Sequence, residues 1–225
     1  MTMLRQILAI LGKDILAELR TKEIFSAMLM FGLLVIVVFN FAFEPSSDEA
    51  LALAPGLLWI AVSFAGVLGL NRSFSSETRM SALQGLMLAP LDRGAIYLGK
   101  MLGNLLFMAV ADLVILACFA VLYNLTILPS LGMVLLILFL GTAGFAIVGT
   151  LFSAVATNTR MSEVMLPILQ LPISVPLLIA AIQATAAVTN PQPGVHVGDW
   201  IKILVVFDVV FGVVCWLLFQ FVIEE

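Results

Sequence analysis

Two carboxylates, Asp112 and Asp208, stand inside long apolar stretches of this 225-residue chain. A carboxylate held at mid-depth in a bilayer costs about 2.5–3.5 kcal/mol, so residues of this kind usually have a task. Such a side chain lines a polar cavity, pairs with a neighbouring helix or stays protonated, and the sequence leaves all three open. It contains no nucleophile–base pattern, paired-carboxylate spacing or metal-ligand cluster, so we expect neither a catalytic residue nor a bound metal.

One short stretch, Gly94-Ala-Ile-Tyr-Leu-Gly99-Lys100, fits the G-x-x-x-x-G-K pattern of a phosphate-binding loop. Met101 stands where that loop needs a Ser or Thr to bind magnesium, and bulky residues fill the middle of the stretch. A turn precedes it where the loop needs a strand, so we interpret the match as chance. ATP hydrolysis, if the protein uses it, is therefore expected in a separate subunit.

Histidine and cysteine are scarce. His196, the single histidine, falls in the last loop before the C-terminal apolar segment, where a solvated side chain is favoured over a ligand. Cys118 and Cys215 stand singly inside apolar stretches, without C-x-x-C spacing. We interpret both as buried small hydrophobic residues, which leaves the redox compartment open.

The composition requires a lipid environment for the elements that carry these residues. Hydrophobic residues make up 63% of the chain and charged residues 11%, whereas soluble domains carry roughly 25% charged residues. The apolar side chains must therefore face lipid, and we expect an all-α polytopic membrane protein that forms one transmembrane domain over residues 1–225. There is no basic patch of the kind that binds nucleic acid.

Six apolar segments are long enough to cross a hydrocarbon core of about 30 Å. The expected transmembrane helices are 24–43, 51–70, 101–122, 130–156, 164–189 and 203–223. A closed barrel would need short alternating strands, which the sequence lacks. We therefore expect a six-helix bundle over residues 24–223.

Lysine and arginine predict the orientation of this bundle. An even number of spans places both termini on one side, and nine of the ten cations fall on that side: Arg5, Lys13, Arg20, Lys22, Arg72, Arg79, Arg93, Lys100 and Arg160. The opposite loops contain only Lys202. The bias predicts a multi-pass membrane protein with both termini in the cytoplasm.

Residues 1–23 form a separate amphipathic element. Apolar residues recur there at intervals of three and four, namely Leu4, Leu8, Leu11, Ile15 and Leu19. Most of the charged residues fall on other faces, which is typical of a helix lying along a membrane surface. A cytosolic extension of the first span is the alternative.

The fifth apolar segment carries Pro167, Pro172 and Pro176. Each proline removes a helix donor and disfavours helical geometry at the preceding residue, so the helix is expected to bend or break there. Such a site is either a hinge or a static kink that neighbouring helices fill.

Small residues in two segments predict close helix packing. The fourth segment carries them four apart, at Thr142, Ala146, Thr150 and Ala154, and the third carries Gly99 and Gly103. Small residues at this spacing let two helix backbones approach each other.

The longest connection, residues 72–94, joins the second and third spans. Ser75 or Ser76 can cap a helix, and Pro90 would end it at residue 89. Asp92 can then cap the following span. We predict a short amphipathic coupling helix at 76–89 on the cytoplasmic face, where it docks on a membrane surface or on a cytosolic protein.

Several stretches together resemble the CcmB family (heme exporter protein B). They are Ala-Pro-Gly-Leu-Leu-Trp at 54–59, Leu-Gln-Gly-Leu-Met-Leu-Ala-Pro-Leu at 83–91, Leu-Gly-Lys at 98–100, Gly-Thr-Ala-Gly-Phe at 141–145 and the proline-containing stretch at 166–179. The second of these is shared more widely with ABC-2 type exporters. The resemblance implies the permease subunit of an ABC-type complex in cytochrome c biogenesis.

The resemblance also implies partners and a use for heme. The permease is expected to form a homodimer with two CcmA-like ATPase subunits, which supply ATP hydrolysis. It is expected to associate with a CcmC-like heme-handling membrane protein, a CcmD-like small subunit and a CcmE-like periplasmic heme chaperone. ATP hydrolysis would drive heme export or the release of the heme-loaded chaperone. The Trp-rich heme motif of partner proteins is missing, so heme is expected in other subunits and no cofactor is expected on this chain.

The contact with the ATPase is assigned to residues of the coupling loop and of the next cytoplasmic loop, 157–163. They are Glu77, Arg79, Met80, Leu83, Gln84, Met87, Arg160 and Glu163. Gln84 departs from the family pattern, which usually has an acidic residue there. Glu77 is then the nearest acid available to the partner.

Three other functions stay open. The chain could serve a different ABC-2 exporter that moves a lipid, a polysaccharide or a drug. It could be a proton-coupled carrier using Asp112 and Asp208, although its halves show no clear inverted repeat. It could also be a scaffolding subunit whose cytoplasmic contacts ATP turnover leaves unchanged.

Overall fold

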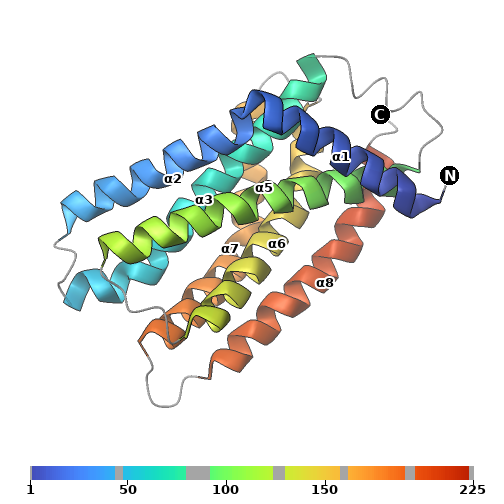
Figure 1. The fold of residues 1–225 in the computed structure, drawn as a ribbon. Coiled ribbons are helices and arrows are strands. Elements are labelled where there is room, and N and C mark those ends of the chain that lie inside the picture. The colour runs from blue at the N-terminus through green and yellow to red at the C-terminus, as the bar shows by residue number, and fades with distance from the viewer. Residues whose placement is uncertain are drawn as a thin grey trace.

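The computed structural model describes residues 2–43, 48–79, 92–123, 130–157, 162–190 and 196–222. These ranges form seven helices and contain no strand, which confirms the all-α fold (Figure 1). In chain order the helices are α1 (Met3–Thr21), α2 (Glu23–Ala42), α3 (Asp48–Arg79), α5 (Arg93–Leu122), α6 (Leu131–Thr157), α7 (Ser162–Thr189) and α8 (Val197–Val222).

Six of these helices are long and apolar enough to span a membrane, as predicted. Among the helix starts, the largest differences from the predicted segments are in α5, which begins at Arg93, and in α8, which begins at Val197. The 30 residues of α5 extend about 45 Å, which is longer than a hydrocarbon core of about 30 Å.

The amphipathic N-terminal helix is also confirmed, and it docks on the bundle. Lys22 adopts a left-handed conformation with φ of 55°, and its N–H donates to the Glu18 carbonyl at 2.7 Å. A residue in this conformation is a common way to end a helix. The chain bends there, so that α1 lies across the first half of α5 while α2 continues at an open angle into the bundle (Figure 1).

Helix α6 lies at the centre of the bundle and packs against α3, α5, α7 and α8. Two glycines make its approach to α3 close. A Cβ atom on Gly141 would lie 2.1 Å from the Trp59 ring, and one on Gly149 would lie 2.3 Å from Leu70. The predicted stripe of small residues on α6 is buried along its whole length, which confirms close packing there.

Helix α7 runs without interruption from Ser162 to Thr189, although Pro167, Pro172 and Pro176 lie inside it. Of the predicted bend or break, the break is therefore wrong, and the bend stays a prediction. Prolines are tolerated in membrane helices because neighbouring helices and local adjustments satisfy the freed carbonyls, and both α6 and α8 pack against α7. A hinge at these prolines stays a prediction.

The packing of α6 against α3 can be tested with Gly141→Ala. The added methyl group would overlap the Trp59 ring, so we expect the free energy of unfolding to fall by about 1–3 kcal/mol. Thermal unfolding in a mild detergent measures this change. Gly132→Ala is the matched control, because no atom lies within 4 Å of the added Cβ at the start of the same helix. Equal stability of the two variants would contradict the close contact.

Candidate functional site

The connection between α3 and α5 is shorter than predicted. Helix α3 continues through Ser75 and Ser76 to Arg79, so the predicted helix start at these serines is wrong. Residues 71–79 contain no proline or glycine, and extending an existing helix is easier than nucleating a new one. The helix of the second span, α3, therefore continues into the predicted coupling loop as far as Arg79.

The predicted ATPase contacts lie partly at the end of this helix. Met80, Leu83, Gln84, Met87 and Arg160 lie outside the described residues. The backbone of Glu77 and Arg79 belongs to the last turn of α3, and that of Glu163 to the first turn of α7; their side chains lie outside the description. The coupling helix and its contacts stay predictions.

The exit of the loop into α5 is anchored to other helices. Asp92 caps α5 as predicted, because its Oδ1 accepts from the Gly94 N–H at 2.8 Å. The Asp92 N–H donates to Oε1 of Gln6 on α1 at 3.4 Å. Arg93 donates through its guanidinium to the Gln220 carbonyl on α8 at 3.2 Å. Movement of the loop end would therefore act on both terminal helices of the chain.

Helix α1 packs against α5 at Gly99 and Gly103. A Cβ atom on Gly99 would lie 2.9 Å from the Cβ of Ile10, so a larger residue there would displace α1. Lys100, between the two glycines, is 2% exposed and pairs with Asp14 of α1 at 2.9 Å. The apparent phosphate-loop match thus has a structural explanation: its second glycine and its lysine form a helix-docking face.

The polar residues inside the bundle are arranged along α6. Thr142 donates to Oδ2 of Asp112 at 2.7 Å, and Asn104 donates to Thr150 at 3.0 Å. The two pairs are eight residues apart on each helix and run antiparallel. The predicted partner of Asp112 on a neighbouring helix is therefore present, and it is a hydroxyl group.

Asp208 approaches α6 at a different residue. Its Oδ1 lies 2.5 Å from the position of a Cβ on Gly144, beside Leu177. Within the part of the chain that the structure describes, this oxygen is buried without a hydrogen-bond partner, as is Oδ1 of Asp112. The two carboxylates thus contact α6 at Thr142 and Gly144, and no hydrogen bond between them is present among the described residues.

Helix α7 contributes polar groups that sequence reasoning missed. Gln170 is fully buried, and its Nε2 donates to the Phe145 carbonyl of α6 at 3.2 Å. Ser174, one turn further along, is also fully buried. Their spacing between the prolines could have signalled an inward polar face. The missed ion pair between Asp14 and Lys100 has no comparable signal, because the two residues are far apart in the sequence.

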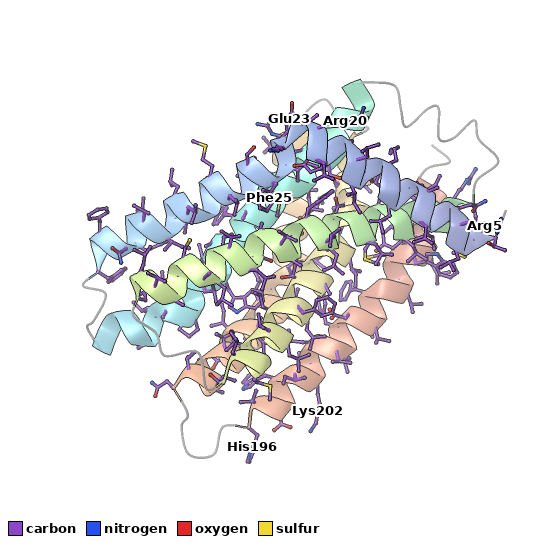
Figure 2. All side chains as sticks on the ribbon, in the orientation of Figure 1. Arg5, Arg20, Glu23, Phe25, His196 and Lys202 are labelled. Atoms are coloured by element: carbon purple, nitrogen blue, oxygen red, sulfur yellow. The ribbon has the colours of Figure 1, made fainter. Side chains whose placement is uncertain are left out.

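The opposite end of the bundle is mainly apolar. The Trp59 indole donates to Thr185 at 3.0 Å, and a small hollow lined by residues including Leu58, Phe119 and Val134 adjoins this pair. His196 is exposed just before α8. Figure 2 shows His196 and Lys202 at the end of the bundle opposite Arg5 and Arg20. The described residues hold no group of three or more His, Cys, Asp or Glu side chains that could bind a metal.

Comparisons with known proteins extend over most of the chain. The model of the family described as CcmB protein matches residues 5–222. The heme exporter protein B of Rhodobacter capsulatus is 29% identical over 171 residues, covering 76% of this chain and 78% of the relative. That of Pseudomonas aeruginosa is 30% identical, covering 70% and 71%. That of Escherichia coli is 30% identical, covering 73% and 74%.

The hydrogen bond between Asp112 and Thr142 allows a direct test of the polar contacts between α5 and α6. Thr142→Val removes the hydroxyl donor and leaves the buried carboxyl group without this partner. We therefore expect the free energy of unfolding to fall by about 1–3 kcal/mol. Adding Asp112→Leu should recover part of this loss, because no polar group then remains unpaired. Thermal unfolding in detergent measures both effects.

Thr189→Val is the matched control for this cycle, because the Thr189 hydroxyl bonds only to carbonyls of its own helix among the described residues. We expect it to change stability less than Thr142→Val. Purely additive effects of the Thr142 and Asp112 substitutions would show that the two side chains do not interact.

Proposed function

We propose, since this chain belongs to the CcmB protein family, that it is the membrane permease subunit of an ABC-type heme export complex in cytochrome c biogenesis. The single observation that supports this most strongly is the match over residues 5–222, together with relatives named heme exporter protein B. The six apolar helices supply the membrane domain that a permease requires. The chain itself is not an enzyme in this proposal.

A CcmA-like ATPase subunit is the proposed source of energy. It would dock on the loop between α3 and α5, with Glu77 and Arg79 at the near end of the loop. The region of Arg160 and Glu163 would form a second contact. Helix α3 supports this because it runs unbroken from the bundle to Arg79, so a displacement of the loop acts along a rigid helix. Asp92, at the other end of the loop, also supports this contact, because its carboxylate caps the N-terminus of α5.

The proposed orientation places this loop and both termini in the cytoplasm of a bacterial cell. The excess of lysine and arginine in the segments that the sequence assigns to this side supports it. Figure 2 shows two of these cations, Arg5 and Arg20, at one end of the bundle and Lys202 at the other. ATP is available only on the cytoplasmic side of the inner membrane. Two copies of the chain with two ATPase subunits would form the working unit.

Heme is the proposed cargo, held mainly by other subunits. A CcmC-like membrane protein, a CcmD-like small subunit and a CcmE-like chaperone would complete the complex. His196 is the only histidine of this chain, and it is exposed at the proposed outer end of the bundle. One copy of the chain therefore cannot supply two histidine ligands to a heme iron. ATP hydrolysis would drive either heme export or release of the loaded chaperone.

One other function receives support from a specific observation. The unpartnered oxygens of Asp112 and Asp208 would suit a proton-coupled carrier. The two carboxylates contact α6 at different residues and do not bond to each other, which disfavours direct proton exchange between them. A carrier of this kind would work on a pH gradient without nucleotide, and Asp112→Asn would abolish its transport.

Co-purification tests the proposed complex. The chain, expressed with its natural genomic neighbours and extracted in a mild detergent, is expected to retain an ATPase subunit, and the same sample is expected to show heme absorbance from the associated subunits. An ATPase without heme would indicate an exporter of another substrate. Repeated isolation without any ATPase would contradict the proposal.

Substitutions in the loop test the coupling contact. Leu83→Asp places a charge on the expected apolar face, and Glu77→Lys reverses the nearest acid. We expect either change to lower the ATP turnover of the assembled complex about five-fold or more, because a loss of 1–3 kcal/mol in coupling corresponds to factors of this size. A steady-state phosphate-release assay on purified complexes measures turnover.

Lys202→Gln is the control for these two variants. Its side chain is exposed at the opposite end of the bundle and pairs only with Asp199 among the described residues. It should leave turnover unchanged. Normal assembly and normal turnover in both loop variants would exclude this loop as the contact.

A further inference from the structure

The first two turns of α5 are packed between the two terminal helices of the chain. On one side α1 contributes Ile10 and Asp14, which contact Gly99 and Lys100. On the other side the last turns of α8 contribute Trp216 and Phe219. We call α1, the start of α5 and the end of α8 together the cytoplasmic clamp.

The contact with α8 is as close as the contact with α1. A Cβ on Gly94 would lie 2.5 Å from Nε1 of Trp216. The ring centroids of Tyr97 and Phe219 are 5.1 Å apart, a distance typical of a favourable aromatic pair. Tyr97 also donates to the Ile147 carbonyl of α6 at 3.0 Å, which ties the start of α5 to the centre of the bundle.

The contact with α1 depends on a buried ion pair. Lys100 is 2% exposed and Asp14 is 12% exposed, and their charged groups are 2.9 Å apart. Lys13 also approaches Asp14, at 3.2 Å, but is 44% exposed. A buried lysine that loses its carboxylate is strongly unfavourable, so this pair resists any separation of α1 from α5.

Helix α1 is also tied to the first span. Oε1 of Glu18 accepts from the Phe25 N–H at 2.8 Å, across the turn at Lys22. Glu18 is buried, and its carboxylate satisfies an N–H group in the first turn of α2 that has no partner within the helix. A displacement of α1 would therefore be passed to α2.

We propose that the cytoplasmic clamp moves as one body when the loop at 80–91 is displaced, and that Asp14 and Lys100 are the positioning residues that lock α1 into it. This inference rests on the proposed function, in which an ATPase displaces that loop. The movement enters at Asp92, passes from α5 to α1 through the ion pair, and reaches α2 through Glu18. Helix α1 is thus a coupling element between the loop and the first span.

A disulfide can replace the ion pair as the lock. The Cβ of Asp14 lies 3.8 Å from the position of a Cβ on Gly103, which suits a disulfide bond. The nearest atoms of α1 would lie 3.7 Å from a Cβ on Gly103, an ordinary van der Waals distance, so this Cβ fits there. The test variant combines Asp14→Cys and Gly103→Cys with Lys100→Met, so that both charges of the ion pair are removed together. Cys118→Ala and Cys215→Ala remove the natural thiols.

Cross-linking of the isolated permease tests the docking without any ATPase. The Asp14→Cys and Gly103→Cys pair is expected to form a disulfide with a mild oxidant. The control pair, Leu8→Cys with Gly103→Cys, is not, because Leu8 is 56% exposed. Equal cross-linking of the two pairs, or none in the test pair, would overturn the placement of α1. This arm is independent of the proposed function.

Turnover of the assembled complex tests the coupling. The reduced test variant has neither ion pair nor disulfide, and we expect its ATP turnover to be about five-fold or more below that of the cysteine-free parent. Oxidation of the same sample should restore turnover to within about two-fold of the parent, with subunit composition unchanged in both states. A merely structural role for Asp14 and Lys100 would not make turnover follow the redox state of an intact complex.

Two results would overturn the proposal. If oxidation stops turnover and reduction restores it, α1 must leave α5 during the cycle. If turnover is the same in both states of an intact complex, the lock has no part in coupling. Failure of the cysteine-free parent to bind any ATPase would instead refute the proposed function, and the cross-linking arm would still decide the docking of α1.

Discussion

A hydrocarbon environment offers no hydrogen-bond partners, and the arrangement of this bundle depends on that constraint. Backbone groups are satisfied within each helix, so a buried polar side chain bonds either to a carbonyl of its own helix, as Thr185 does, or to a group on a neighbouring helix. Helix α6 provides most of the partners on neighbouring helices. Thr142 and Thr150 pair with residues of α5, and the carbonyls of Phe145 and Ile147 accept from α7 and α5. The neighbouring helices α5 and α7 are thus held to the central helix, α6, by side-chain hydrogen bonds.

The same helix contacts are close because small residues form them. Gly141 and Gly149 leave no room for a side chain between α6 and α3, and Gly99 leaves none between α5 and α1. Interiors packed at this density transmit displacement instead of absorbing it. The permease is therefore expected to respond to a force at its cytoplasmic end by moving helices as units, and the anchored start of α5 is where such a force would enter.

Much of this architecture could be predicted from the sequence, because hydrophobic length, small-residue spacing and capping are local signals. The six spans, the Asp92 cap and the buried stripe on α6 follow from them. Tertiary partners could not be predicted. Nothing local pairs Asp14 with Lys100, and the prolines of α7 predict a bend or a break, whereas α7 is continuous and packs against α6 and α8. The extension of α3 to Arg79 is not predicted, because Ser75 and Ser76 are residues that favour the start of a new helix. In the structure the helix of the second span continues through both serines.

In the proposed complex, a separate ATPase acts on the loop between α3 and α5. A photoreactive amino acid placed at position 84, in native membranes that contain the whole complex, would cross-link to whatever contacts this loop. We expect one dominant adduct, with the ATPase subunit. An adduct with lipid alone, or with a protein on the outer side of the membrane, would contradict it.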